Sequence, residues 1–260
     1  MELNSVQEAA EQQFSRQSHK YGRGHILENI QDVEKGVEGI PIRKGDSALD
    51  VATGGGHTGI FFARQGLDVT LADISSSMLE KASSLAAEQG LKVKTRQHSA
   101  EELPYPSDSF DWVTCRVAGH HFSSPQKFVF ESGRILKPGG HLLIIDGTVK
   151  DKIPIAEEWI HQVEKLRDPS HNRFRRPSEW AAWCEAAGLK VLKCETNPFK
   201  QPDLEWYFET ADTSLENRAK VKELVSTVPS QAAEAFGLAL EAGKTIWWWH
   251  RLTLVAEKTA

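Results

Sequence analysis

The 260-residue sequence predicts an α/β fold built on a largely parallel sheet. From Asp46 onward, apolar runs of strand length alternate with helical stretches, which is typical of βαβ units. A glycine-rich loop directly follows the first of these runs. The apolar runs are far shorter than the ~20 residues of a membrane-spanning helix, so we expect no membrane partner.

Seven strands are expected, and the first, second and fifth are nearly continuous apolar runs. Such runs are typical of strands that are covered on both faces. The expected strands are 48–52, 68–72, 92–97, 110–116, 141–146, 190–196 and 246–255.

Helices are expected between these strands, and proline stands near the start of several of them, where its missing N–H is tolerated. The expected helices are 59–65, 76–89, 125–136, 154–167 and 177–187. Two further stretches are polar and helical in pattern: 3–40 before the first strand, and about 197–244 before the last. An insertion as long as the second is often a lid over a binding site.

Composition excludes several classes of protein. Lys and Arg number 31 against 36 Asp and Glu, a net charge of −5, which disfavours a nucleic-acid partner. The three cysteines are far apart and include no CxxC pair, which indicates reduced thiols and neither a disulfide framework nor a zinc site. The N-terminal segment lacks the pattern of a secretory signal, so we expect a soluble, cytoplasmic protein.

The strongest motif is the loop at 50–59, which reads DVATGGGHTG. Small residues there let the backbone approach a ligand closely as a strand turns into a helix. These residues are Ala52, Gly54, Gly55 and Gly56. Asp73 ends the next strand, where a carboxylate can accept hydrogen bonds from both hydroxyls of a ribose. The pattern indicates an adenosine-containing ligand; the alternative is a tight turn followed by a helix-capping Asp.

The acid at the start of this loop selects among adenosine ligands. The Asp50 carboxylate would repel the pyrophosphate of a dinucleotide but suits a ligand with an ammonium group. The Tyr-x-x-x-Lys pair of short-chain hydride-transfer enzymes is also missing from the sequence. These observations favour S-adenosyl-L-methionine, with S-adenosyl-L-homocysteine as its product.

Residues 47–146 resemble the UbiE/menaquinone-type subgroup (methyltransferase type 11) of the class I S-adenosylmethionine-dependent methyltransferases. The loop at 50–59 is similar to their motif I. Further matching segments are ADIS at 72–75, AEELPY at 100–105, SFDWVTCR at 109–116 and RILKPGG at 134–140. The resemblance implies a Rossmann-like, doubly wound, seven-stranded, mostly parallel sheet with an antiparallel last strand, a helical N-terminal cap and a helical insertion before the last strand.

The resemblance also implies a single methyltransferase domain over 1–260. Its parts are a helical cap at 1–40, a cofactor-binding half at 41–150, and a substrate-side half at 151–260 that contains the insertion at about 197–244. Phe14, Tyr21 and Gly22 resemble a mobile cap over the cofactor, and an ordinary packing helix is the alternative.

Cofactor-binding residues follow from the same resemblance, position by position. They are Asp50, Ala52, Gly54, Gly56, Asp73, Ile74, Ser99, Ala100, Glu101 and Arg116. The sequence departs from the family pattern twice. Ala52 replaces a usual glycine, and Ser99 replaces an acid that binds the adenine amino group, a task left to Ser99 or the Ala100 backbone. Glu101 is a ligand contact or a helix cap.

The segment after the fourth strand carries the candidate catalytic residues. Methyl transfer is an in-line displacement that depends mainly on positioning, and it needs a base only when the acceptor arrives protonated. His121 and His120 are the candidate bases, His121 first, because histidine titrates near neutral pH. Neighbouring side chains tend to point apart, so we expect at most one to face the pocket; the alternative is that one fixes the loop.

Arg116 ends the fourth strand, where an unpaired buried charge is costly. It either binds an anionic group of the substrate or cofactor, or forms an ion pair with Asp50 or Asp146. Asp146 itself either lines the pocket or caps the end of its strand. No metal is expected, because the fourth strand ends in arginine and the histidines lack metal-ligand spacing.

Two segments on the substrate side leave alternatives open. Four arginines within 167–177 indicate either an anion site or a solvated loop. On the last strand, alternation sends Trp247 and Trp249 to one face and Trp248 to the other. Burial against the insertion explains them, and an aromatic substrate platform or a homodimer surface is the alternative.

The sequence therefore predicts a methyltransferase that acts on a small-molecule, ring-containing metabolite through an O, N, S or C acceptor. The alternatives are a non-methylating S-adenosylmethionine-binding protein and an NAD(P)-dependent oxidoreductase.

Overall fold

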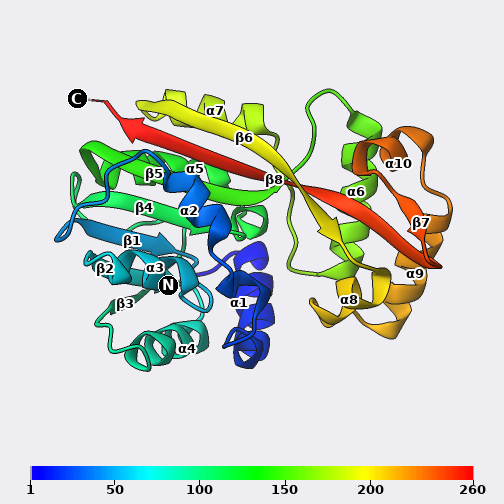
Figure 1. Ribbon diagram of the computed structural model, residues 1–260, viewed down its shortest axis with the longest axis horizontal. Helices are drawn as coiled ribbons and strands as arrows, with labels where there is room; N and C mark the ends of the chain where they lie inside the picture. Colours follow the sequence, from blue (N-terminus) through cyan, green and yellow to red (C-terminus); the bar gives the residue numbers. More distant parts are fainter. Residues whose placement is uncertain (1, 260) are drawn as a thin grey trace.

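A twisted central sheet organises the computed structural model, which describes residues 2–259 (Figure 1). The strand order is β3-β2-β1-β4-β5-β8-β6, with the short β7 paired to β8. Strands β1 to β5 pair in parallel, and β8 is antiparallel to both β5 and β6. The strands are β1 Ser47–Val51, β2 Asp68–Asp73, β3 Lys94–Gln97, β4 Phe110–Arg116, β5 Leu136–Thr148, β6 Leu189–Gln201, β7 Ala239–Glu241 and β8 Lys244–Lys258. The predicted Rossmann-like sheet is confirmed, and β7 is an addition to it.

Helices cover both faces of the sheet. One face packs against α2, α3 and α4, and the other packs against α5 and α7. The helices are α1 Ser5–Gln17, α2 Gln31–Val37, α3 His57–Arg64, α4 Ser76–Ala87, α5 Pro125–Ile135, α6 Pro154–Arg167, α7 Pro177–Ala186, α8 Leu204–Glu209, α9 Leu215–Ser226 and α10 Ser230–Phe236. Short 3-10 turns lie at Ser18–Lys20, Ile26–Glu28 and Gly119–His121.

Strands β5, β6 and β8 extend well beyond the ranges that the sequence pattern predicts. β5 starts at Leu136, directly after α5, so the LKPGG segment lies within the strand. β6 continues to Gln201 and stays paired with β8 as far as Trp247. The insertion therefore begins after Gln201 and not at 197, because backbone pairing with β8 extends a segment whose side chains are mostly polar.

The paired ends of β6 and β8 leave the sheet as a ribbon that carries a second lobe (Figure 1). The lobe contains α6 and α8 to α10, and it has an apolar core of its own, separate from the cores on the two faces of the sheet. Trp247 is fully buried in that core, edge-on to Tyr207 at 4.5 Å between ring centroids. Burial in the lobe therefore accounts for Trp247.

Within residues 2–259, no helix combines the length and the apolar character that crossing a membrane requires.

Candidate functional site

The loop from β1 to α3 depends on glycine for steric reasons. Gly54 and Gly56 have φ angles of +53° and +80°. A Cβ atom at Gly55 would lie 2.6 Å from the carbonyl oxygen of Tyr21, and one at Gly56 would lie 2.8 Å from the Cβ of Ala82. The loop backbone is therefore clamped between the N-terminal segment and α4, with no space for larger side chains.

Asp73 ties the end of β2 to this loop. Its carboxylate is buried and accepts hydrogen bonds from the backbone N–H groups of Gly54 and Ser75, each at 2.9 Å. Burial raises the pKa of Asp73 to about 6, although these two amides favour the ionised form. The side chain lines a cavity at the carboxyl ends of β1 and β2.

Asp50 departs from the expectation that it contacts the ligand's ammonium group. Its carboxylate accepts hydrogen bonds from the Thr114 hydroxyl at 2.6 Å and the Gly59 N–H at 3.1 Å, and also from Thr53. It does not line the cavity. All three partners are protein groups, so Asp50 shapes the loop from behind.

The cavity at the carboxyl ends of β1, β2 and β4 is called the first cavity below. Gly56, like Asp50, is not part of its lining, because it packs against α4. The other predicted site residues that line it are Ala52, Gly54, Asp73, Ile74, Ser99, Ala100, Glu101, Arg116 and His121.

Ser99 and Glu101 are both engaged with protein groups. The Ser99 hydroxyl accepts from the side chain of Gln7 at 2.9 Å and from the Glu101 N–H at 3.1 Å. The Glu101 carboxylate accepts from the N–H groups of Ser123 at 2.7 Å and Ser124 at 3.0 Å, at the start of α5. Glu101 thus acts as a helix cap that also forms part of the cavity wall.

Arg116 pairs with an acid of the N-terminal segment, Asp32. Its guanidinium lies 2.8 Å from Asp32 in α2 and donates to the carbonyls of Leu27 and Asn29. The predicted pairing with Asp50 or Asp146 is wrong, because the end of β4 faces the N-terminal segment. Arg116 therefore holds residues 27–32 against the first cavity.

The two histidines both line a second cavity, which corrects the expectation that at most one would face a pocket. The reason is the 3-10 turn at Gly119–His121, in which neighbouring side chains do not alternate as they do in a strand. The second cavity adjoins the first on one side and the lobe on the other. Five residues line both cavities: Phe14, Tyr21, Leu27, Val117 and His121.

His120 and His121 differ in basicity. Nδ1 of His120 lies 2.6 Å from the Asp146 carboxylate. Burial opposes the charged form of His120, but the charge and hydrogen bond of Asp146 outweigh it and raise the pKa. Burial and the neighbouring charge of His120 lower the pKa of His121 to about 4, and its Nδ1 lies 3.1 Å from the carbonyl of Ser170. Near neutral pH, His120 is therefore the stronger base.

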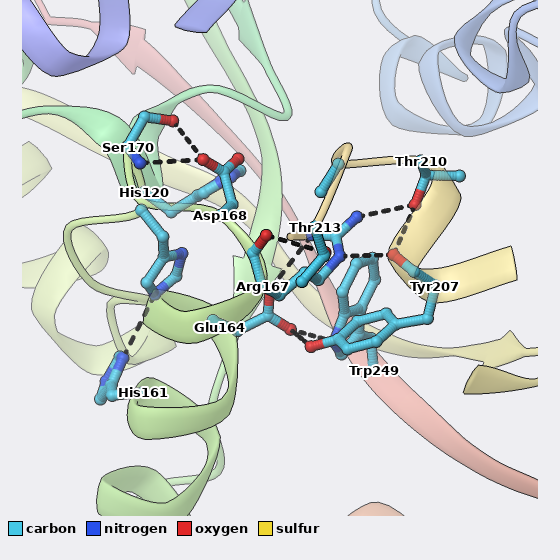
Figure 2. A network of polar contacts seen from close by, with 12 residues as sticks. His120, His161, Glu164, Arg167, Asp168, Ser170, Tyr207, Thr210, Thr213 and Trp249 are labelled. Atoms are coloured by element: carbon cyan, nitrogen blue, oxygen red, sulfur yellow. Dashed lines mark hydrogen bonds and ion pairs between the residues drawn. The ribbon is translucent and has the colours of Figure 1, made fainter. Parts of the chain in front are cut away.

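The lobe supplies a polar wall of the second cavity (Figure 2). The buried Glu164 accepts from the Tyr207 hydroxyl at 2.7 Å and the Trp249 N–H at 2.8 Å, and it pairs with Arg167 at 3.2 Å. Arg167 also donates to the Thr210 hydroxyl at 2.9 Å. These residues come from α6, α8, β8 and the turn after α8, so no local motif could have identified them.

The ion pairs of the arginine-rich segment 167–177 disfavour the first of its two alternatives, an anion site. Arg173 and Arg176 both pair with Glu157, and Arg167 pairs with Glu164. Acids of α6 thus neutralise three of the four arginines.

Helix α1 bridges the two parts of the site. It lies between the sheet and the lobe (Figure 1), and Gln7 contacts the first cavity through Ser99. At the lobe, the side chains of Gln13 and Gln17 donate to the carbonyl of Ala211 at 3.3 and 3.1 Å. The N-terminal segment therefore covers both cavities, as a cap would.

Replacing Gln13 and Gln17 together by alanine is expected to loosen this cap. Two hydrogen bonds of about 1 kcal/mol each would be lost, so amides of α1 should exchange with solvent roughly 30-fold faster. Hydrogen exchange measured by mass spectrometry tests this, with the exposed Gln12→Ala as the control. Unchanged exchange in the double variant would show that these contacts do not hold α1.

The first cavity fits S-adenosylmethionine by the chemistry of its lining. A buried carboxylate ends β2, Gly54 and Gly55 present loop backbone without side chains to the cavity, and Arg116 borders the same space. These are groups suited to a ribose, a close-lying ligand chain and a carboxylate. Residues 2–259 contain no group of three or more His, Cys, Asp or Glu side chains placed to hold a metal ion.

Comparisons with known proteins agree with this geometry. A family model described as a methyltransferase domain matches residues 49–144. The uncharacterised methyltransferase YcgJ of Bacillus subtilis is 36% identical over 177 residues, which cover 68% of this chain and 70% of YcgJ. The crystal structure of YcgJ superposes with a TM-score of 0.80 at 28% identity, covering 88% of this chain and 99% of that one.

A ubiquinone biosynthesis O-methyltransferase of Alkalilimnicola ehrlichii is 32% identical over 177 residues, covering 66% of this chain and 71% of that protein. The match to this family favours a methyltransferase over the two alternatives that the sequence left open. The chain belongs to the class I S-adenosylmethionine-dependent methyltransferases of the UbiE type.

Proposed function

We propose that the protein methylates a small, ring-containing metabolite bound in the second cavity. The observation that carries this proposal is the position of His120, which the buried Asp146 holds from behind, in a cavity that shares a wall with the cofactor cavity. Aromatic side chains form much of the surrounding surface and suit a flat ring. They include Phe14, Phe174, Phe199, Trp206 and Trp249.

Each residue at the first cavity has a proposed role in binding the cofactor. Asp73 would accept hydrogen bonds from the ribose hydroxyls, and Ser99 and the Ala100 backbone would border the adenine, since all three residues line the cavity. Ala52, Gly54 and Ile74 provide backbone and apolar contacts, while Asp50 and Gly56 support the loop from outside the cavity. When bound, S-adenosylmethionine supplies an activated methyl group on a sulfonium.

His120 is the proposed general base. Its Nδ1 is held by Asp146, which leaves Nε2 free to take a proton from the acceptor. The acceptor atom forms a bond to the methyl carbon, its proton passes to His120, and the electrons of the broken S–C bond remain on sulfur. His121, with its lowered pKa, remains neutral and separates the two cavities, edge-on to Phe14.

An oxygen acceptor is favoured within this proposal. A hydroxyl arrives protonated and therefore needs a base, whereas a sulfide or tertiary amine does not. The relative from Alkalilimnicola ehrlichii is named as an O-methyltransferase, which supports the same choice.

The proposal is tested by titrating the protein with S-adenosylhomocysteine and with NADH, and by measuring transfer of a labelled methyl group to phenols, ring amines and ring thiols. We expect binding of S-adenosylhomocysteine, no binding of NADH, and methylation of at least one phenol. Cofactor binding without methylation of any ring compound would overturn the small-ring acceptor.

Replacing Asp146 by asparagine is expected to move the pH profile of kcat/KM. The rate should fall in the wild-type enzyme as pH drops through the raised pKa of His120, because only the neutral imidazole accepts a proton. Without the carboxylate, burial still disfavours the charged imidazole, so this acidic limb should move about 1–3 pH units lower. The exposed Asp151→Asn is the control. If the acidic limb of the kcat/KM profile does not move, the His120–Asp146 pair is not the group whose titration limits the rate.

A further inference from the structure

Arg251 is a cation in the wall of the second cavity that the methyl-transfer steps above do not use. It lies in β8, opposite Gly147 of β5 and therefore next to the position of Asp146. Its guanidinium carbon lies 4.3 Å from the centroid of the Phe199 ring, and its Nη1 donates to Asp32 at 3.2 Å. Within residues 2–259 this is the one hydrogen bond of its guanidinium, so most of the guanidinium N–H donors have no protein acceptor.

The carboxylates near the cavity are each engaged elsewhere. Asp32 lies closer to Arg116, at 2.8 Å, so one carboxylate serves two guanidiniums. The remaining acids have partners of their own. These pairs are Glu164 with Arg167, Asp146 with His120, and Asp168 with Ser170. Arg251 is therefore the cation of this wall without a counter-ion of its own.

The lack of a full counter-ion is energetically costly because Arg251 is largely buried. Its side chain is 18% exposed. Burial lowers the pKa of the Arg251 guanidinium and Asp32 offsets this only in part, because Arg116 adds a like charge. A buried charge with unfilled donors is stabilised by any anion that reaches it. A planar guanidinium with free donors matches a carboxylate, which it can bind through two parallel hydrogen bonds.

We propose that the methyl acceptor is a ring compound that carries a carboxylate, which Arg251 binds while His120 faces the acceptor group. A carboxylate is favoured over a phosphate because one guanidinium of this wall has unused donors, and because Glu164, which lines the cavity, would repel a dianion more strongly than a monoanion. This inference rests on the proposed function and names its substrate class.

The test compares three probes that differ only at the acidic group: 3,4-dihydroxybenzoate, its methyl ester and catechol. Each is titrated into the protein saturated with S-adenosylhomocysteine, and binding is measured by calorimetry. We expect the acid to bind roughly 10- to 100-fold more tightly than the ester or catechol, the range of a hydrogen bond to a charged group. Equal or tighter binding of the ester would overturn the proposal and leave the small-ring acceptor intact.

Variants of Arg251 test whether this residue causes the preference for the acid over its methyl ester. Arg251→Met should abolish the advantage of the acid over the ester, and Arg251→Lys should keep part of it. Asp32 retains Arg116 in both variants, so the fold is expected to persist, and thermal unfolding checks this. Arg218→Met, on the outside of the lobe, should keep the full preference. A preference that survives Arg251→Met would overturn the assignment.

A negative result is also informative. If S-adenosylhomocysteine binds but none of the three probes does, the carboxylate proposal is rejected, the cofactor assignment stands, and the small-ring acceptor is decided by the panel of phenols, ring amines and ring thiols.

Discussion

Replacing His120 by alanine is expected to lower kcat by about 10²–10⁴-fold, the range of a general base, and to leave the affinity for S-adenosylhomocysteine unchanged. The separation of the two effects follows from the structure, since His120 lines the second cavity and does not line the first. Steady-state kinetics and cofactor titration measure the two quantities on the same preparations.

A second variant distinguishes a missing base from a disturbed fold. Removing the imidazole takes away the side-chain donor to the buried Asp146 and leaves it the Gly147 N–H, and this loss is itself destabilising. His120→Gln keeps a donor for Asp146 but cannot accept a proton, so it should be as inactive as alanine and more stable to heat. The exposed His19→Ala is the control. Activity retained in the glutamine variant would show that His120 positions Asp146 and does not act as a base.

Replacing Asp73 by asparagine is expected to weaken S-adenosylhomocysteine binding by roughly 100- to 1000-fold. The carboxylate offers acceptor lone pairs to the loop amides and to a ribose at once, and an amide group would turn an N–H₂ donor toward one of them. Hydrogen bonds to a charged acceptor contribute about 1.5–3 kcal/mol each, which corresponds to this loss for one to two bonds.

Asp68→Asn is the matched control for this variant. Asp68 begins the same strand, but it is exposed and pairs with Lys94 far from the cavity, so cofactor binding should not change. Comparable binding by Asp73→Asn and Asp68→Asn would remove Asp73 from the cofactor site. The folded state is checked separately by thermal unfolding, because Asp73 also holds the loop to β2.

The cofactor half was predictable because its signals are local. The strand, glycine loop and acid at 48–73 lie within one βαβ unit, so their spacing alone brings Gly54 and Asp73 to one cavity. Asp50 has the same local signal, but its direction depended on Thr114 of the neighbouring strand β4. The Asp50 carboxylate could point toward the cavity or away from it. The Thr114 hydroxyl orients it away, and the sequence pattern does not place Thr114 beside Asp50.

The ion-pair partner of a buried charge was less predictable, because it depends on contacts between segments that are distant in the sequence. Arg116 pairs with Asp32, which is 84 residues away, although acids in neighbouring strands were the obvious candidates. The paired histidines were misjudged for a different reason. The two histidines lie in a 3-10 turn, where side chains do not alternate as they do in a strand. No residue in the segment is a sequence signal for that turn.

The sequence by itself determined the sheet and the glycine loop, because apolar periodicity and glycine spacing act over a few residues, and the resemblance of residues 47–146 to the methyltransferase motifs indicated the class of cofactor. Only the tertiary structure decided what faces the substrate. The ribbon of β6 and β8 carries the lobe beside the sheet, and α1 lies between the two (Figure 1), so that Glu164, Arg251 and His120 line one cavity, with Asp146 holding His120 from behind. Those groups come together through packing between segments that are distant in the sequence, and the same packing determines which partner each buried charge has.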